Sequence, residues 1–119
     1  MHLRHLGLLV ADQERSQRFY ATYFAFDPAT ATRYPDGTVI IRDADGFDLA
    51  LHQSPTPPGE LPEFLHFGFR CTTPDEVHAL HHRLLADGIP IVAADNDPDL
   101  ISIKCLDPDR YPVEIYWEP

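Results

Sequence analysis

The feature that most constrains the fold of this 119-residue chain is an internal repeat. Residues 5–7 read His-Leu-Gly, and residues 66–68 read His-Phe-Gly. An acidic turn and the strand after it also correspond between residues 43–50 and 107–114. Similarity between successive halves of one chain is typical of a duplicated structural unit. The sequence therefore predicts two copies of one module.

Hydrophobic periodicity gives the first module the order strand, helix and three strands. Period-2 alternation predicts a strand over 3–10, and aromatic residues at helical spacing predict a helix over 13–24 that Asp12 caps. The pair Asp27-Pro28 is expected to end that helix, because the residue before a proline disfavours helical geometry. Turn-forming residues separate three further strands, expected at 31–34, 38–42 and 47–53.

The same order follows a segment at 54–62 with four prolines in nine residues, which we expect to be a stiff linker. Thr73 and Glu76 have the spacing of a capping box, and Pro74 occupies the first helical position. A helix should therefore begin there, and Gly88 should stop it. The strands of this half are expected at 64–71, 89–93, 100–106 and 112–117.

These elements predict an α+β fold made of two βαβββ modules. The modules are expected at 1–53 and 63–119, joined by the proline-rich linker at 54–62, and together they form one domain. A chain of this length can bury roughly two-thirds of its unfolded surface, which is enough for a real core.

Charge and composition exclude several classes of function. A formal net charge of −10 repels phosphate backbones, so nucleic-acid binding is not expected. No apolar run approaches a membrane span, and the N-terminus shows no signal-peptide pattern, so we expect no membrane association. Two cysteines inside apolar runs, Cys71 and Cys105, are expected to be reduced thiols in a cytoplasmic protein.

The repeat also brings together residues that can bind a metal. The repeat-equivalent positions hold His5 and Ala50 in the first module, and His66 and Glu114 in the second. Three of these four residues are metal ligands by type. Two imidazoles and a carboxylate can hold a divalent ion and leave coordination positions open, which is typical of catalytic rather than structural sites. The sequence therefore predicts a metal site at His5, His66 and Glu114.

The strand expected at 112–117 supports this interpretation. Its alternation puts Glu114 and Tyr116 on the face opposite the apolar residues. His52 lies two residues beyond Ala50 and occupies the position in the first half that Tyr116 occupies in the second. Either side chain could act as an acid–base or orienting group beside the metal. The candidate catalytic residues are therefore Glu114, Tyr116 and His52.

The combined pattern resembles the vicinal oxygen chelate superfamily over essentially the whole chain. That superfamily contains glyoxalase I, fosfomycin-resistance transferases, extradiol dioxygenases and bleomycin-resistance proteins. The features that carry the resemblance are the order of elements, both His-x-Gly sequences, Ser-x-x-Phe-Tyr at 16–20 and the acidic turn leading to Glu114.

The resemblance implies a fold, a chemistry and an assembly. The paired βαβββ modules would curl a mixed sheet into an open barrel around the site. The positions of His5, His66 and Glu114 are the family's ligand positions, for a divalent ion such as Fe, Mn, Zn or Ni. The substrate would be a small molecule that chelates the ion through adjacent oxygens. A homodimer is expected, with sites that could be shared between chains.

Departures from individual branches leave the reaction open. Ala50 replaces the fourth ligand of glyoxalase I and favours the two-histidine, one-carboxylate arrangement of the extradiol dioxygenases. The fosfomycin enzymes have a C-terminal extension that is missing from this sequence, which stops at Pro119. The alternative is a metal-free protein of the bleomycin-resistance type that sequesters a cationic small molecule. The net charge fits that alternative, whereas the three retained ligands favour an enzyme. Its reaction would be of the lyase, isomerase or ring-cleaving dioxygenase type. Loops at 34–37, 54–62 and 94–99 are expected to shape the pocket.

Overall fold

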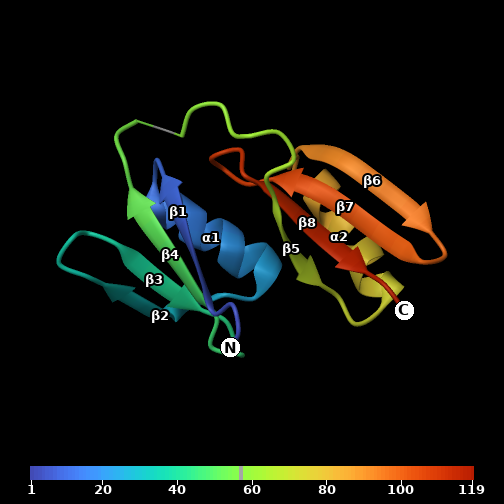
Figure 1. Cartoon of the computed structure of the whole chain (residues 1–119), viewed down its shortest axis with the longest axis horizontal. Coiled ribbons are helices and arrows are strands. Elements are labelled where there is room, and N and C mark those ends of the chain that lie inside the picture. The colour runs from blue at the N-terminus through green and yellow to red at the C-terminus, as the bar shows by residue number, and fades with distance from the viewer. Residues whose placement is uncertain (57) are drawn as a thin grey trace. The chain divides into compact units, whose positions relative to one another are not determined.

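Two units make up the computed structural model, which describes residues 1–56 and 58–119. The units are Met1–Glu60 and Leu61–Pro119, and each contains one helix and one four-stranded sheet (Figure 1). The division falls inside the predicted linker at 54–62, of which Pro57 lies outside the described residues.

The first unit has the predicted order of one strand, one helix and three strands. Its elements are β1 (His5–Val10), α1 (Gln13–Phe24), β2 (Asp27–Arg33), β3 (Val39–Arg42) and β4 (Asp48–Gln53). The strand order in the sheet is β1-β4-β3-β2. Pairing of β1 with β4 is parallel and the other two pairings are antiparallel. The parallel pairing requires the long connection from β1 that includes α1.

Helix α1 has its predicted bounds, but a different residue ends it. The Asp12 side chain accepts a hydrogen bond from the backbone N–H of Arg15, as an N-cap residue does. The helix ends at Phe24, because Ala25 adopts the left-handed conformation with φ of 58°. The prediction that Asp27-Pro28 ends the helix was wrong, since both residues already belong to β2. This strand is at the sheet edge, where a proline is tolerated.

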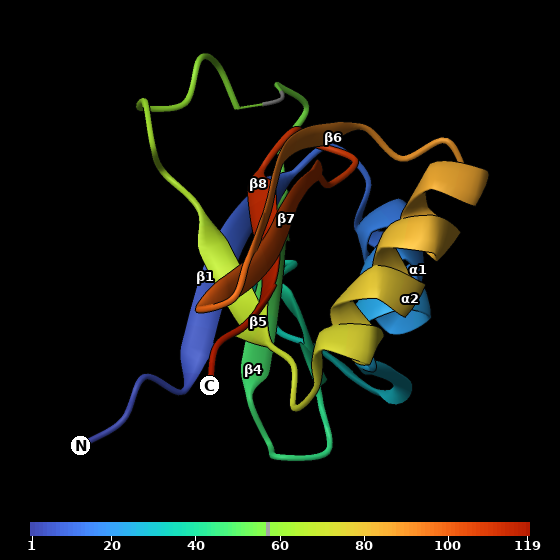
Figure 2. The same cartoon turned by 90° about the vertical axis from the view of Figure 1, so that its right-hand side faces the viewer.

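The second unit repeats this arrangement. Its elements are β5 (Phe67–Arg70), α2 (Pro74–Ala86), β6 (Ile91–Asp97), β7 (Leu100–Leu106) and β8 (Pro112–Trp117). The strand order is β5-β8-β7-β6, again with one parallel pairing, between β5 and β8. Figure 2 shows α2 alongside this sheet, where Val77 and Leu84 bury completely. The capping box of Thr73 and Glu76 forms as predicted.

Two strands of the second unit differ from the prediction. The strand expected at 64–71 covers only Phe67–Arg70, because Phe64 has a φ of 68° that no strand residue adopts. The loop expected at 94–99 is mostly strand, since β6 continues to Asp97 and pairs with Leu100 of β7. Exposed acidic residues concealed this edge strand, because they interrupt its apolar pattern.

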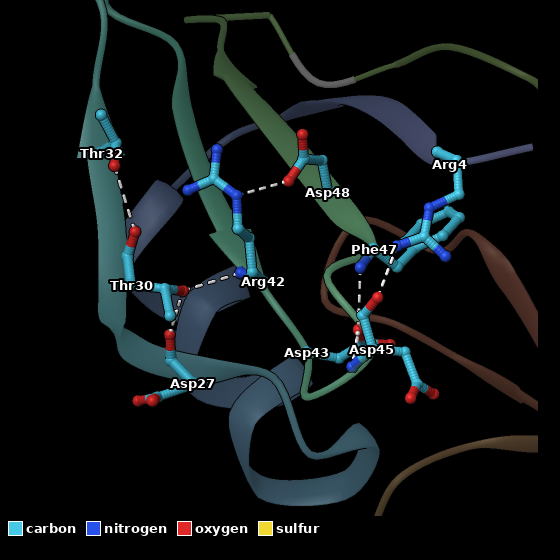
Figure 3. Close-up of polar contacts among 9 residues, drawn as sticks. All are labelled: Arg4, Asp27, Thr30, Thr32, Arg42, Asp43, Asp45, Phe47 and Asp48. Carbon is cyan, nitrogen blue, oxygen red and sulfur yellow. Dashed lines mark hydrogen bonds and ion pairs between the residues drawn. The ribbon is translucent and has the colours of Figure 1, made fainter.

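The hydrogen bonds of two turns confirm the duplication. One oxygen of the Asp43 carboxylate accepts from the backbone N–H groups of Asp45 and Phe47, at 3.0 and 2.9 Å (Figure 3). The Asp107 carboxylate accepts from the residues two and four positions later, both at 2.9 Å. Each turn then places its fourth residue in the left-handed region, with φ of 78° at Gly46 and 70° at Arg110.

Additional polar contacts fasten the first of these turns to the strands on either side. The Arg4 guanidinium donates to the backbone carbonyl of Asp45, and Arg42 forms an ion pair with Asp48 at 2.7 Å (Figure 3). The hydroxyl of Thr30 on β2 accepts from the backbone N–H of Arg42. These contacts fix where β4 begins, and so fix the register of β4 against β1.

The α+β class and the two βαβββ modules are therefore confirmed. The two sheets are separate, and no strand pairing joins them within residues 1–56 and 58–119. A search of the same residues finds no helix with the length and apolar character of a membrane span.

Candidate functional site

Strand β8 positions Glu114 on the polar face of the second sheet. Its neighbours in sequence, Val113 and Ile115, are fully buried on the opposite face, as the alternation predicted. Gly68 of β5 lies beside Glu114 in the parallel pairing. A Cβ atom at Gly68 would lie 3.3 Å from the Glu114 Cβ and 3.4 Å from the Tyr116 ring. The glycine therefore gives both side chains room above the sheet.

His66, immediately before β5, points its imidazole at Glu114. Its Nε2 atom lies 3.4 Å from Oε2 of the carboxylate, and both side chains are 21% exposed. Its Nδ1 atom lies 2.7 Å from the backbone carbonyl oxygen of Phe64. A carbonyl oxygen only accepts hydrogen bonds, so Nδ1 carries a proton. In the neutral imidazole, the Nε2 lone pair therefore faces the carboxylate.

Ser102 of β7 fixes the other oxygen of the same carboxylate. Its hydroxyl donates to Oε1 of Glu114 at 2.6 Å, and the serine is only 3% exposed. A short bond of this kind to an ionised acceptor is strong and directional. Ser102 thereby leaves Oε2 facing the imidazole of His66.

The donor atoms of this pair fit a divalent ion. Two acceptor atoms that face one another need a cation or a proton between them. Tetrahedral coordination with bonds of roughly 2.0–2.1 Å puts neighbouring ligand atoms about 3.4 Å apart. The Nε2–Oε2 separation matches that spacing. The Phe64 carbonyl and the Ser102 hydroxyl hold the outer sides of the two ligands, as outer-shell partners commonly do in metal sites.

The other predicted site residues are distributed between the two units. Tyr116 shares the polar face of β8 with Glu114, two residues further along. His5 is exposed at the start of β1, and Ala50 pairs with Gly7 as Glu114 pairs with Gly68. His52 Nδ1 lies 3.0 Å from the Thr38 hydroxyl oxygen. The structure thus brings together His66 and Glu114, and no group of three His, Cys, Asp or Glu side chains suited to a metal occurs among the described residues.

His52 instead lines a polar cleft of about 350 Å³ in the first unit. The buried Gln13 also lines this cleft, and its carboxamide donates to the backbone carbonyls of Gly37 and Leu51, each at 2.8 Å. Hydrogen bonds from the backbone and side chain of Thr38 lower the pKa of the Asp36 carboxyl, which keeps a negative charge at its rim. The remaining lining residues are Arg33 and Gln53.

Sequence reasoning missed two residues of the site, Ser102 and Lys104. Both lie on β7 and share the polar face of β8, because Lys104 pairs with Glu114 and Ser102 pairs with Tyr116. The signal was the alternation within 100–106, which puts both polar side chains on one face. It could not show that this face adjoins Glu114, because strand register depends on the folded sheet.

The fold matches many solved structures. A possible glyoxalase from Bacillus cereus is 24% identical, with a TM-score of 0.79 and 97% of each chain covered. The fosfomycin resistance protein FosX from Listeria monocytogenes is 17% identical, with a TM-score of 0.81, covering 100% of this chain and 94% of that one. A structure of FosX complexed with Mn(II) and a sulfate ion matches at 18% identity and a TM-score of 0.80, covering 99% of this chain and 90% of that one.

At these identities the likeness shows the fold alone, and no curated protein matches the chain in sequence. The sequence model that describes the Glyoxalase/Bleomycin resistance protein/Dioxygenase superfamily matches residues 2–115. That match covers both modules, both His-x-Gly sequences and Glu114. The chain belongs to the Glyoxalase/Bleomycin resistance protein/Dioxygenase superfamily, the vicinal oxygen chelate proteins.

Proposed function

We propose that this protein is a divalent-metal-dependent enzyme that acts on a small molecule chelating the ion through adjacent oxygens. The observation that carries the proposal is the His66–Glu114 pair, with two acceptor atoms 3.4 Å apart and facing one another. The proposed metal ligands are His66, Glu114 and His5. His5 enters from its position in the repeat and from the family's ligand pattern.

Neighbouring protein groups would hold two of the proposed ligands in a fixed geometry. Ser102 holds one oxygen of Glu114, and the Phe64 carbonyl holds the proton-bearing nitrogen of His66. When bound, the ion would supply Lewis acidity, polarising an oxygen of the substrate. Its identity is proposed from the group Fe, Mn, Zn and Ni, which mixed imidazole and carboxylate ligands suit. The structural neighbour FosX, solved with Mn(II), supports the choice of a divalent ion.

Acid–base work is assigned to side chains beside the ligands. Tyr116 shares the face of Glu114 and can hold or move a proton at its phenolic oxygen. His52 is the proposed second acid–base group, because it occupies the repeat position of Tyr116. The reaction is of the lyase, isomerase or ring-cleaving dioxygenase type.

The proposal includes the assembly and the compartment. We place the protein in the cytoplasm, since both cysteines are free thiols. A homodimer whose chains share sites is the proposed form. If ligands come from two chains, metal binding would stabilise the dimer by mass action.

Metal analysis tests the proposal directly. Protein purified without added ions, and protein dialysed against each of the four ions, is measured by inductively coupled plasma mass spectrometry. We expect one equivalent per chain, lost in His66→Ala and in His5→Ala. His78→Ala is the matched control, because His78 is exposed on α2 and lies outside the proposed site. A wild type without metal under all these conditions, or a His66→Ala variant with full occupancy, would refute the proposal.

The reaction type needs a separate assay. Protein loaded anaerobically with Fe(II) is mixed with a catechol and then with air. A yellow ring-cleavage product identifies a dioxygenase. A colourless outcome with stoichiometric metal assigns the protein to the lyase or isomerase types.

The net charge of −10 favours one second candidate, a metal-free protein that sequesters a cationic small molecule. Such a protein would carry no stoichiometric metal, and His66→Ala would leave its ligand binding unchanged. Titration calorimetry with bleomycin before and after chelator treatment separates the two candidates. Binding that is unaffected by both the chelator and His66→Ala would support sequestration.

A further inference from the structure

One cation stands beside the proposed metal ligands, and it is the only lysine of the sequence. Lys104 lies on β7 directly opposite Glu114 in the antiparallel pairing. Residues directly opposite one another project from the same face of a sheet. The lysine therefore shares its face with Glu114, Ser102 and Tyr116.

The Lys104 ammonium forms no ion pair with a carboxylate of the described residues. This is unexpected in a chain with a net charge of −10, and more so directly opposite a glutamate. Instead, one oxygen of Glu114 accepts from Ser102 and the other faces His66. Arg70 on the same sheet is different, since its guanidinium contacts Glu118 twice. Lys104 thus retains its capacity for an anion.

An exposed aromatic ring holds this cation at the edge of the site. The Lys104 ammonium lies 5.1 Å from the centroid of the Phe64 ring, and that ring stands edge-on to the His66 imidazole at 5.0 Å. The Phe64 side chain is 82% exposed. A cation–π contact at an exposed site is weaker than a charge-assisted hydrogen bond. An anion arriving beside His66 would therefore draw the ammonium from the ring.

We infer that Lys104 binds an anionic group of the ligand, a carboxylate or a phosphonate, next to the His66–Glu114 pair. The inference rests on the proposed function, because the same ligand would chelate the metal through its adjacent oxygens. It narrows the substrate class to small oxyanions. Neutral and cationic molecules lack a negative charge to pair with the ammonium.

Paired probes of matched shape test the role of the charge. Methylphosphonate is compared with uncharged dimethyl sulfone, and acetate with uncharged acetamide, by titration of wild type, Lys104→Met and Lys104→Arg. Methionine keeps an aliphatic chain over Phe64 without the charge, and arginine keeps the charge. We expect Lys104→Met to weaken binding of an anionic probe by about tenfold or more and Lys104→Arg to preserve it within a few-fold. The neutral probes should respond to neither change.

The single lysine permits a direct spectroscopic measurement. Reductive methylation with ¹³C-formaldehyde labels only Lys104 and the terminal amine. The Lys104 methyl signal should shift and saturate with the same dissociation constant as probe binding, and the effect should weaken with added salt. Equal affinity in wild type and Lys104→Met, a stationary methyl signal during probe binding, or no detectable anion binding would overturn the inference.

The metal content of each variant separates this inference from the proposed function. Lys104→Met should retain the wild-type metal content, since the ammonium ligates nothing. If metal binds and the anionic probes are indifferent to Lys104, the anion inference fails and the metal function stands. If no metal binds but the probes still require Lys104, the metal function fails and the anion site stands.

Discussion

The two halves of this protein have the same backbone fold but carry different side chains at the equivalent site positions. Gly7 pairs with Ala50 in the first sheet as Gly68 pairs with Glu114 in the second. The acidic turn before each of these strands has the same hydrogen bonds. The equivalent position is alanine in the first copy and glutamate in the second. Only the second sheet therefore has a carboxylate there.

The neighbouring hydroxyl groups follow that difference. Thr38 lies two residues before Ile40, the partner of Ala50, as Ser102 lies two residues before Lys104, the partner of Glu114. Ser102 donates to Glu114, whereas Thr38 lies against the His52 imidazole. A duplicated scaffold therefore keeps its hydroxyl and changes the group that the hydroxyl contacts. The scaffold thus fixes the positions, and single side chains assign the chemistry.

The largest expected effect comes from making the second half resemble the first. Glu114→Ala introduces the residue found at position 50 and removes a proposed ligand. We expect metal affinity to fall by at least about 100-fold, more than the loss of an outer-shell partner causes. Equilibrium dialysis against a metal indicator measures it, with Glu60→Ala as the control carboxylate. Unchanged affinity would mean that the two halves do not differ in metal chemistry.

The hydroxyl comparison predicts a smaller effect. Ser102→Ala leaves the Glu114 carboxylate free to rotate, and we expect about a tenfold loss of metal affinity. Thr38→Val removes the corresponding hydroxyl of the first half and should leave affinity unchanged. The same dialysis measures both variants. Equal losses in the two variants would contradict the assignment of the metal to Glu114.

The matched turns predict opposite effects on stability. Gly46→Ala puts a side chain at φ of 78° and should destabilise the protein by about 1 kcal/mol. Arg110→Gly relieves the same strain at φ of 70° and should stabilise it by a similar amount, since the arginine is exposed. Urea denaturation measures both free energies of unfolding. A destabilised Arg110→Gly variant would show that the arginine side chain contributes contacts that outweigh the strain.

The smallest expected effect concerns the thiols, which occur only in the second half. Burial raises the pKa of Cys105 from its ordinary value of 9.0 to about 12. Unfolding exposes the thiol, so the unfolded chain loses its proton first as the pH rises. The stabilisation is therefore complete below pH 9 and is lost progressively between pH 9 and about 12.

Urea denaturation at several alkaline pH values measures this decline. Cys105→Val removes the titrating thiol and should flatten the stability curve above pH 9. Cys71→Ala is the control, since Cys71 is less buried and burial raises its pKa less. A Cys105→Val curve parallel to the wild type would show that the decline has another cause.

Local sequence signals predicted much of the fold. The cap at Asp12, the capping box at Thr73 and the alternation around Glu114 all act over a few residues, and each formed as expected. The end of α1 at Phe24 was also as predicted, but its cause was not: Ala25 ends the helix, in a left-handed conformation that is uncommon outside glycine and asparagine. The predicted start of β5 was wrong, because Phe64 also adopts a left-handed conformation.

By itself the sequence determined that the chain is a duplication with two imidazoles and one carboxylate at repeat positions. The repeat and the alternation carry that information along the chain. Only the tertiary structure decided that Ser102 and Lys104 stand beside Glu114, and that the imidazole of His66 faces this carboxylate. The physical reason is strand register, since these neighbours are distant in sequence and a one-residue shift would turn each side chain to the opposite face.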